Sequence, residues 1–323
     1  MSVTEDVLGQ PFTVETIELA PDFEGEVTAA LVRLGAAEPT DAAVLYVHGF
    51  SDYFFQRELA QWWTERGYDF YALDLRKYGR AMRPHHTKAY VADLSQYDEE
   101  LDEAWKRITE RDGHTRVIVS AHSTGGLTTP LWVARRQPRE LVGMVLNSPW
   151  LDMQGSPGQV RTLTVAARIM ARLAPRKVIP REVSGLYTRS LHHTLDGEWD
   201  FDLDLKPIGS FPVTFGWVNA IRRGHARVHE GLGIDVPILV LASEKSGNPT
   251  EPGPAVHSMD IVLDVRQIKR WAPSLGGDVT YVSLPGALHD VVLSAPVVRT
   301  AAYAAIDSWL AAKISAHAGR HRA

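Results

Sequence analysis

Five short runs of apolar residues, each rich in β-branched side chains, stand out in the hydrophobic pattern of the chain. Each run is continuously apolar rather than alternating, which is typical of strands buried on both faces of a parallel sheet. The runs cover residues 42–48, 116–122, 141–147, 236–242 and 279–284. Residues 11–33 hold two further apolar stretches, which predict an antiparallel hairpin at the edge of this sheet.

Segments with helical spacing separate these runs. In residues 54–66 the side chains of Leu59 and Trp62 share one side of a helix, and residues 93–110 are acidic and amphipathic. Two more helices are expected at residues 124–136 and 296–313. Because strands and helices alternate, the pattern predicts an α/β fold with a mostly parallel, doubly wound sheet.

The alternation stops after Trp150 and resumes near Gly233. The residues between them are mostly polar and helical in spacing, so we predict a helical cap (lid) at 151–233, inserted before the penultimate core strands. The core would then comprise residues 1–150 and 234–323. Open α/β sheets place their active sites at the C-terminal edge of the strands, which such a cap would cover.

Composition narrows the possible functions. The 323 residues are 45% hydrophobic with a formal net charge of −5, and no long Lys/Arg run indicates a nucleic-acid partner. The chain has no cysteine, which excludes a thiol nucleophile, a zinc–thiolate site and disulfides. The acidic N-terminal segment lacks the pattern of a signal peptide, and no apolar run reaches the roughly 18 residues of a membrane span. We therefore expect a soluble, cytoplasmic protein of unspecified oligomeric state.

The most informative motif is Ala121-His122-Ser123-Thr124-Gly125-Gly126, directly after a predicted strand. Small residues on both sides of Ser123 allow a tight strand-to-helix turn that holds the serine in a strained conformation with its hydroxyl exposed. The following helix N-terminus favours a developing oxyanion. We predict that Ser123 is a nucleophile, the alternative being an ordinary helix start.

A second motif, His48-Gly49-Phe50, follows the first buried run. Acyl transfer needs two donors for the oxyanion, one from the residue after the nucleophile and one from an earlier loop. We predict that the N–H groups of Thr124 and Phe50 are these donors. The His48 ring is expected to brace the loop without taking part in chemistry.

A histidine on the loop Pro285-Gly-Ala-Leu-His289-Asp290, between the last strand and the last helix, could reach this serine. His289 would act as general base and then as general acid. His225 and His229 have the i,i+4 spacing of a metal pair, but no carboxylate motif accompanies them. We predict no metal and no cofactor.

Together these motifs resemble the monoacylglycerol lipase and lysophospholipase branch, which is serine aminopeptidase-like, of the α/β-hydrolases. The resemblance rests on His48-Gly49, Asp74-Leu-Arg-x-x-Gly79-Arg, Ala-His-Ser-Thr-Gly-Gly and Gly-x-x-His289-Asp. It implies the α/β-hydrolase fold and hydrolysis of lipid-like carboxylic esters by a Ser-Asp-His triad.

This branch has an aspartate in a Gly-x-x-Asp pattern after the strand at 236–242, where the present chain reads Ser243-Glu-Lys-Ser246. A longer Gly/Pro-rich loop follows and reaches Asp260 just before the next helix. We predict Asp260 as the triad acid. Asp264, which fits a helix N-cap, and Glu244 remain alternatives.

Residues 160–173 of the predicted cap are sharply amphipathic, and residues 153–181 contain no acidic side chain. Val160, Leu163, Ala167 and Met170 share one helical face, whereas Arg161, Arg168 and Arg172 share another. Two interpretations of this helix remain open: a transient contact with a membrane surface, or packing on the sheet with a solvated basic face. Aromatic side chains that could line an acyl pocket are Tyr53, Phe54, Trp150 and Trp217.

The sequence therefore predicts a serine hydrolase of carboxylic esters, with a monoacylglycerol-like or lysophospholipid-like substrate. Amide or peptide hydrolysis is an alternative, because the same triad serves aminopeptidases. A third interpretation is a non-catalytic ligand receptor on the same scaffold, although candidates for all three triad members are present.

Overall fold

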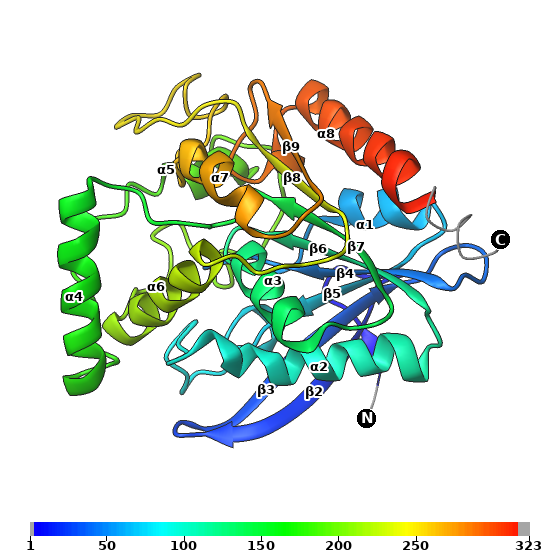
Figure 1. The fold of residues 1–323 in the computed structure, drawn as a ribbon, viewed down its shortest axis with the longest axis horizontal. Coiled ribbons are helices and arrows are strands. Elements are labelled where there is room, and N and C mark those ends of the chain that lie inside the picture. The colour runs from blue at the N-terminus through cyan, green and yellow to red at the C-terminus, as the bar shows by residue number, and fades with distance from the viewer. Residues whose placement is uncertain (1–2, 316–323) are drawn as a thin grey trace.

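A nine-stranded sheet runs through the computed structural model, which describes residues 3–315 (Figure 1). The strand order is β1-β2-β3-β5-β4-β6-β7-β8-β9. From β5 to β9 all neighbours pair in parallel, whereas β1, β2 and β3 pair antiparallel at one edge. The strands are β1 Val3–Glu5, β2 Thr13–Asp22, β3 Gly25–Leu34, β4 Ala42–Val47, β5 Asp69–Asp74, β6 Arg116–His122, β7 Leu141–Asn147, β8 Ile238–Ser243 and β9 Val279–Leu284. The predicted parallel core and the edge hairpin are both confirmed.

Helices cover both faces of the sheet, which explains why the central strands are continuously apolar. Leu45 and Val47 of β4 pack in one hydrophobic cluster, and Val44 and Tyr46 pack in the other. The first cluster includes side chains from α2 (Asp98–Lys106), α3 (Gly125–Arg136) and α7 (Val265–Trp271). The second includes side chains from α1 (Arg57–Thr64) and α8 (Pro296–Trp309).

The local structure differs from the sequence-based prediction at two places. Strand β5 was not predicted, although it lies at the centre of the fold between β4 and β3. The helix expected from residue 54 begins only at Arg57, because the Phe54 N–H donates to the Asp74 carboxylate at 3.0 Å and its ring is fully buried.

Between β7 and β8 the chain forms α4 (Pro157–Leu173), α5 (Leu186–Leu191) and α6 (Phe215–His229), with no strand of the sheet. Helix α4 packs on α6 and lies farthest from the sheet, at the left of Figure 1. It begins with a capping box, in which Ser156 and Gln159 bond reciprocally. None of the helices in residues 3–315 is long and apolar enough to cross a membrane.

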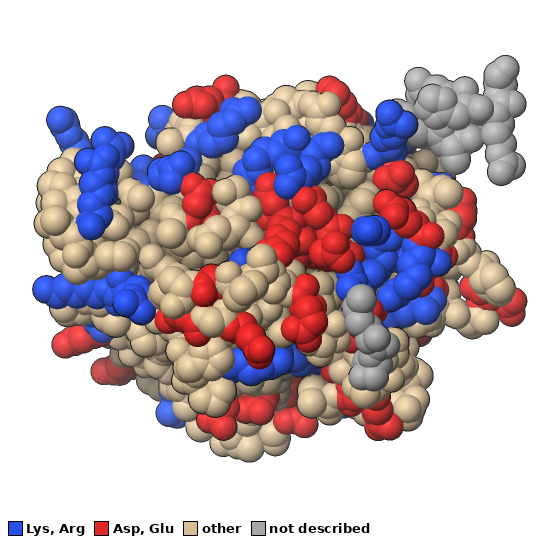
Figure 2. All heavy atoms as spheres, turned by 90° about the horizontal axis from the view of Figure 1, so that it is seen from below, with Lys and Arg blue, Asp and Glu red and all other residues tan. Residues whose placement is uncertain are grey.

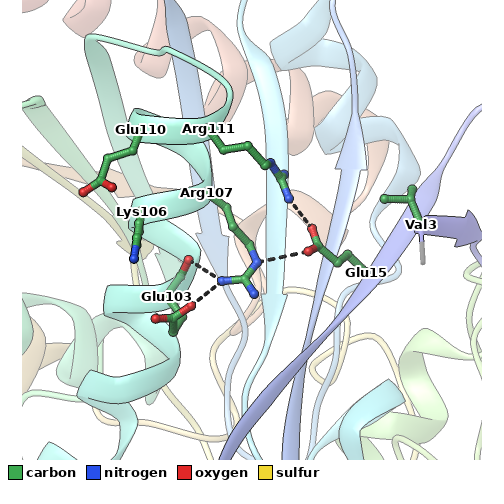
Figure 3. A pocket seen from close by; sticks show the side chains of 7 residues that line it. All are labelled: Val3, Glu15, Glu103, Lys106, Arg107, Glu110 and Arg111. Atoms are coloured by element: carbon green, nitrogen blue, oxygen red, sulfur yellow. Dashed lines mark hydrogen bonds and ion pairs between the residues drawn. The ribbon is translucent and has the colours of Figure 1, made fainter. Parts of the chain in front are cut away.

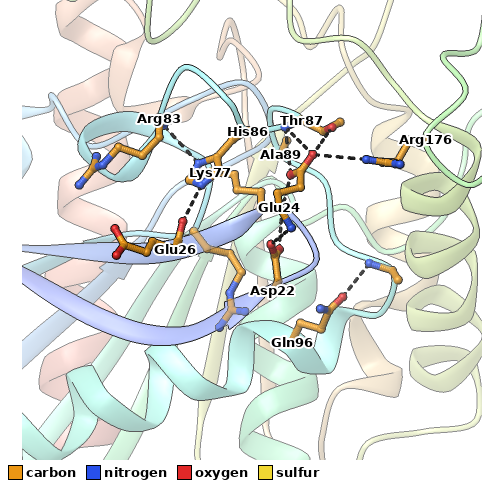
Figure 4. Close-up of polar contacts among 12 residues, drawn as sticks. Asp22, Glu24, Glu26, Lys77, Arg83, His86, Thr87, Ala89, Gln96 and Arg176 are labelled. Carbon is orange, nitrogen blue, oxygen red and sulfur yellow. Dashed lines mark hydrogen bonds and ion pairs between the residues drawn. The ribbon is translucent and has the colours of Figure 1, made fainter.

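Ion pairs fasten the edge hairpin to the rest of the molecule at two places. Glu15 of β2 accepts from Arg107 at 3.1 Å and Arg111 at 2.6 Å, beside a cavity of about 540 Å³ (Figure 3). At the other end Lys77 is fully buried and pairs with Asp22 at 2.5 Å and Glu24 at 2.6 Å (Figure 4). Buried charges need such partners, so these contacts hold the hairpin in place.

Candidate active site

Ser123 lies at the turn between β6 and α3 with a φ of 53°, in the left-handed region that side chains rarely adopt. Its N–H donates to the Asn147 carbonyl and its own carbonyl accepts from the Trp150 N–H, both at 3.0 Å. A Cβ on Gly125 would lie 2.5 Å from the carbonyl oxygens of Val47 and His48. This position therefore requires glycine, and the turn is held in its strained form by its neighbours.

His289 joins Ser123 to Asp260. Its Nε2 lies 3.0 Å from the Ser123 Oγ, and its Nδ1 lies 2.9 Å from Asp260 Oδ2. With Nδ1–H donating to the carboxylate, Nε2 is free to accept the serine proton. Asp260 is fully buried, and its Oδ1 accepts from the N–H groups of Val262 and Leu263 at 2.8 Å each. The structure thus brings the three predicted side chains into one hydrogen-bonded chain.

The long loop returns Asp260 to the place where the branch has its aspartate. Ser246, which stands at the aspartate position of the Gly-x-x-Asp pattern, forms a β-bridge with Asp260. The Asp260 N–H donates to the Lys245 carbonyl at 3.0 Å, and the Gly247 N–H donates to the Asp260 carbonyl at 3.1 Å. Residues 247–259 therefore form a loop whose two ends meet at the bridge between Ser246 and Asp260.

The two alternative acids lie elsewhere. Asp264 is the N-cap of α7, where its carboxylate accepts from the Arg266 N–H and pairs with the Arg266 side chain. Glu244 is exposed to solvent. Neither side chain contacts His289 in the described residues.

The loop of Phe50 passes directly against the serine. A Cβ on Gly49 would lie 3.0 Å from the Ser123 Cβ. Within residues 3–315 the N–H groups of Phe50 and Thr124 have no hydrogen-bond acceptor. The first N–H groups of a helix are unsatisfied by its own carbonyls, so the Thr124 donor remains available to a ligand.

His48 and Asp74 hold this loop in place. The His48 Nδ1 donates to the Gly49 carbonyl at 2.7 Å, and its Nε2 accepts from the Leu75 N–H at 3.1 Å, which confirms the bracing role. Asp74 accepts from the Phe54 N–H at 3.0 Å and from the Arg80 side chain at 2.7 Å. The Asp74-x-x-x-x-Gly79-Arg80 motif therefore supports the loop that carries Phe50.

Asn147 and Gln56 bond to the residues that follow His289. No local sequence motif indicates this role for either residue. Asp290, next to His289, accepts from Asn147 Nδ2 at 2.6 Å and from Gln56 Nε2 at 3.2 Å. Asn147 Oδ1 also accepts from the Val291 N–H at 3.1 Å. These bonds fix the backbone that directly follows the histidine.

A second histidine, His122, lies beside His289 with ring centroids 4.8 Å apart. Burial lowers the pKa of His122 to about 4, assisted by the charges of His289 and Lys206 and opposed by those of Asp290 and Asp52. His122 therefore remains neutral at physiological pH and adds no positive charge next to the base.

A buried ion pair links the loop that carries Phe50 to the segment 151–233. Lys206 Nζ lies 2.7 Å from Asp52 Oδ1, with 4% and 2% of the two side chains exposed. Burial opposes the charged form, but Lys206, His122 and His48 outweigh it, so the pKa of Asp52 is lowered. Asp52 Oδ2 is buried without a partner in the described residues. Nothing in the sequence pairs these two residues, which lie far apart along the chain.

The predicted pocket aromatics fall into two groups. The ring centroid of Trp217 lies 4.3 Å from that of Phe50 and 5.8 Å from that of Trp150, so these rings lie beside the loop that carries Phe50. The Phe54 ring is instead fully buried against Tyr46 and Phe70 in the interior. The Tyr53 hydroxyl accepts from the Asp202 N–H at 2.8 Å.

Two histidines of α6 bond to the backbone. His225 and His229 of α6 donate from Nε2 to the carbonyls of Trp150 and Leu151, at 3.0 and 2.9 Å, where the chain leaves β7. Burial lowers the pKa of His225 to about 3. His192, His193 and Asp200 have ligand-type atoms within 4.8 Å of one another, but both ring nitrogens of His192 are already bonded, to Thr194 and to the Phe201 carbonyl.

Comparison with known proteins gives concordant results. The family model of serine aminopeptidase S33 matches residues 38–247, which is more than half of the chain. The match includes Ser123 and the Phe50 loop and ends before Asp260 and His289. Phospholipase YtpA of Bacillus subtilis is 29% identical over 114 residues, or 35% of this chain. The matched part spans only 42% of that relative.

Solved structures resemble the chain over nearly its whole length. A soluble variant of monoglyceride lipase from Saccharomyces cerevisiae, in complex with a substrate analogue, has a TM-score of 0.66 at 16% identity and covers 91% of this chain and 93% of its own. A thermostable carboxyl esterase from Bacillus coagulans, in complex with glycerol, has a TM-score of 0.65 at 15% identity and covers 93% and 99%. At these identities the likeness shows the α/β-hydrolase fold.

Proposed function

We propose that the chain, which belongs to the serine aminopeptidase S33 family of lipase/esterase-like α/β-hydrolases, cleaves carboxylic esters. Ser123 is the nucleophile in this proposal. The observation that carries this proposal is the hydrogen-bonded chain Ser123–His289–Asp260, with distances of 3.0 and 2.9 Å. Its chain order, serine, aspartate, histidine, is the order used by this fold.

In the proposed mechanism Ser123 Oγ attacks the ester carbonyl while His289 Nε2 takes the hydroxyl proton. Asp260 holds the Nδ1–H tautomer and stabilises the imidazolium that forms. The N–H groups of Phe50 and Thr124 donate to the tetrahedral oxyanion. His289 then protonates the leaving alkoxide, and water, activated by the same base, releases the acid from the acyl-enzyme.

We propose a lipid-like substrate, such as a monoacylglycerol or a lysophospholipid. The rings of Phe50, Trp150 and Trp217 beside the oxyanion donors supply an apolar surface for an acyl chain. The names of the monoglyceride lipase and phospholipase relatives favour the same class. Residues 151–233 would form the cap over this site, with a transient contact between α4 and a membrane surface.

Amide hydrolysis is the second candidate, favoured by the aminopeptidase description of the family. Parallel assays on a chain-length series of aryl esters and on aminoacyl anilides separate the two. We expect ester cleavage with a preference for longer acyl chains. Faster cleavage of the anilides would favour the peptidase.

The nucleophile is tested by Ser123→Ala. We expect kcat to fall by roughly 10⁶-fold while the protein stays folded, because triad members act as a unit. A fluorophosphonate should add one equivalent to the wild type, measured by intact mass, and none to the variant. Stoichiometric labelling of Ser123→Ala would show that another residue is the nucleophile.

A further inference from the structure

A cavity of about 420 Å³ lies on the outer side of the segment 151–233, between α4, α6 and residues 90–92. Three of the side chains that line it are arginines, Arg168 and Arg172 from α4 and Arg223 from α6, and none is acidic. Tyr90 and Asn219 add polar groups to its wall. The cavity is therefore basic and separate from the residues around Ser123.

The positive charge of this cavity is only weakly compensated. Arg168 and Arg172, one helical turn apart, have no ion-pair or hydrogen-bond partner within residues 3–315. Arg223 pairs with Asp93 at 2.7 Å, but 65% of its side chain is exposed, and exposed pairs contribute little. The nearby carboxylate of Glu24 is occupied by Lys77 and Thr87 (Figure 4).

An exposed apolar stripe runs along the same helix beside the cavity. Val165, Ile169 and Leu173 follow one another at intervals of four residues and are 50%, 53% and 75% exposed. Arg172 lies between this stripe and the cavity at helical spacing. Lys and Arg side chains gather at the upper left of Figure 2, on the side where Figure 1 shows α4.

We propose that this cavity binds the phosphate group of an anionic phospholipid in a bilayer, while Val165, Ile169 and Leu173 enter the interface beside it. Guanidinium groups bind phosphate in bidentate fashion, and two of them face the cavity unpaired. A soluble anion would use the arginines and leave the apolar stripe in water, whereas a bilayer surface satisfies both. This inference names the lipid that the proposed contact between α4 and a membrane surface would recognise. It rests on that proposed contact and does not depend on the proposed ester hydrolysis.

Vesicle sedimentation tests this site. The protein carries Ser123→Ala so that no lipid is consumed, and the vesicles contain phosphatidylcholine alone or mixed with phosphatidylglycerol. We expect strong binding only to the mixed vesicles. Arg168→Gln/Arg172→Gln should weaken it roughly thirtyfold, since each basic side chain near an anionic surface contributes about 1 kcal/mol. Ile169→Ser/Leu173→Ser should also weaken binding without changing the melting temperature.

A matched control removes two positive charges elsewhere. Lys106→Gln/Arg139→Gln changes two exposed side chains outside α4 and α6 and should leave vesicle binding within about threefold of the parent. Equal losses in both double variants would overturn the proposal in favour of net charge alone. If inorganic phosphate stabilises the parent but not Arg168→Gln/Arg172→Gln, and vesicles do not bind, the cavity takes soluble anions instead. Because the nucleophile is absent, failure of the ester proposal leaves this measurement unaffected.

Discussion

Asp260 and Asp264 are both aspartates and lie four residues apart, but their surroundings differ. Asp260 is fully buried and divides its oxygens between His289 and two backbone N–H groups. Asp264 sits at the start of α7, partly exposed, and bonds to Arg266. The first arrangement orients an imidazole, whereas the second stabilises a helix end.

This difference predicts separable effects of substitution. Asp260→Asn should lower kcat by roughly 10⁴-fold, because an amide favours the wrong His289 tautomer. Asp264→Ala should leave kcat near the wild-type value and cost about 1 kcal/mol of stability through the lost N-cap. Kinetics and thermal melting of both variants decide the matter. Substantial activity in Asp260→Asn would remove Asp260 from the triad.

How much of the site the sequence reveals depends on how local each signal is. Ser123 and His289 stand in short motifs directly after predicted strands, so their positions follow from neighbouring residues alone. Asp260 could be predicted only from the resemblance and from the length of the loop before it. Lys206, Asn147 and Gln56 act through contacts between distant parts of the chain, which no local pattern encodes.

At the scale of elements, the two parts of the segment 151–233 are attached differently. Residues 199–211 bond to the loop that carries Phe50 and to the Leu293 carbonyl. The bonds come from the Trp199 indole, the N–H groups of Asp202 and Phe211, and the Lys206–Asp52 pair. Helix α4 buries only Ala167 and packs on α6. The inner part is thus fastened to the core, and α4 is the more loosely held element.

The Lys206–Asp52 pair predicts a double-mutant result. Lys206→Met leaves Asp52 buried without a counter-charge, which should cost about 3–5 kcal/mol in the free energy of unfolding. Asp52→Asn in the same chain removes the uncompensated charge and should restore part of that loss. Urea unfolding of both single variants and the double variant measures the coupling. Additive losses would show that the pair contributes nothing as a pair.

Strand β5 shows why one central element escaped prediction. Its apolar core, Phe70 to Leu73, is bounded by Asp69 and Asp74 and is shorter than the five runs that predict the other parallel strands. Both aspartates are buried and serve specific contacts, Asp69 with Arg33 and Asp74 with the Phe54 loop. The aspartates at both ends of β5 bond to neighbouring segments. They also shorten the apolar run by which a buried strand is identified.

For the whole molecule, paired carboxylates are one source of pH-dependent stability. The pKa values of Glu15, Glu24, Asp52, Asp69 and Asp112 are all lowered, since partner cations and hydrogen bonds outweigh burial. Glu100 is the exception, because complete burial outweighs Arg76 and raises its pKa. Carboxylates with a lowered pKa bind protons more readily in the unfolded chain than in the folded one. Their contribution to the free energy of unfolding therefore decreases as pH falls.

Asp69 allows a specific test of this acid sensitivity. Burial would raise the pKa of Asp69, but His114, the Ala36 N–H and Arg33 together lower it from 3.8 to about 2. The contribution of this carboxylate to stability is therefore complete above the unfolded value of 3.8 and is lost as pH falls through the folded value. Asp69→Asn should lower the melting temperature at neutral pH, and its difference from the wild type should shrink below about pH 4. Asp235→Asn, a change of an exposed aspartate, serves as the control and should have little effect. A difference between Asp69→Asn and wild type that stays constant down to about pH 2 would mean that the variant acts through lost packing rather than lost charge.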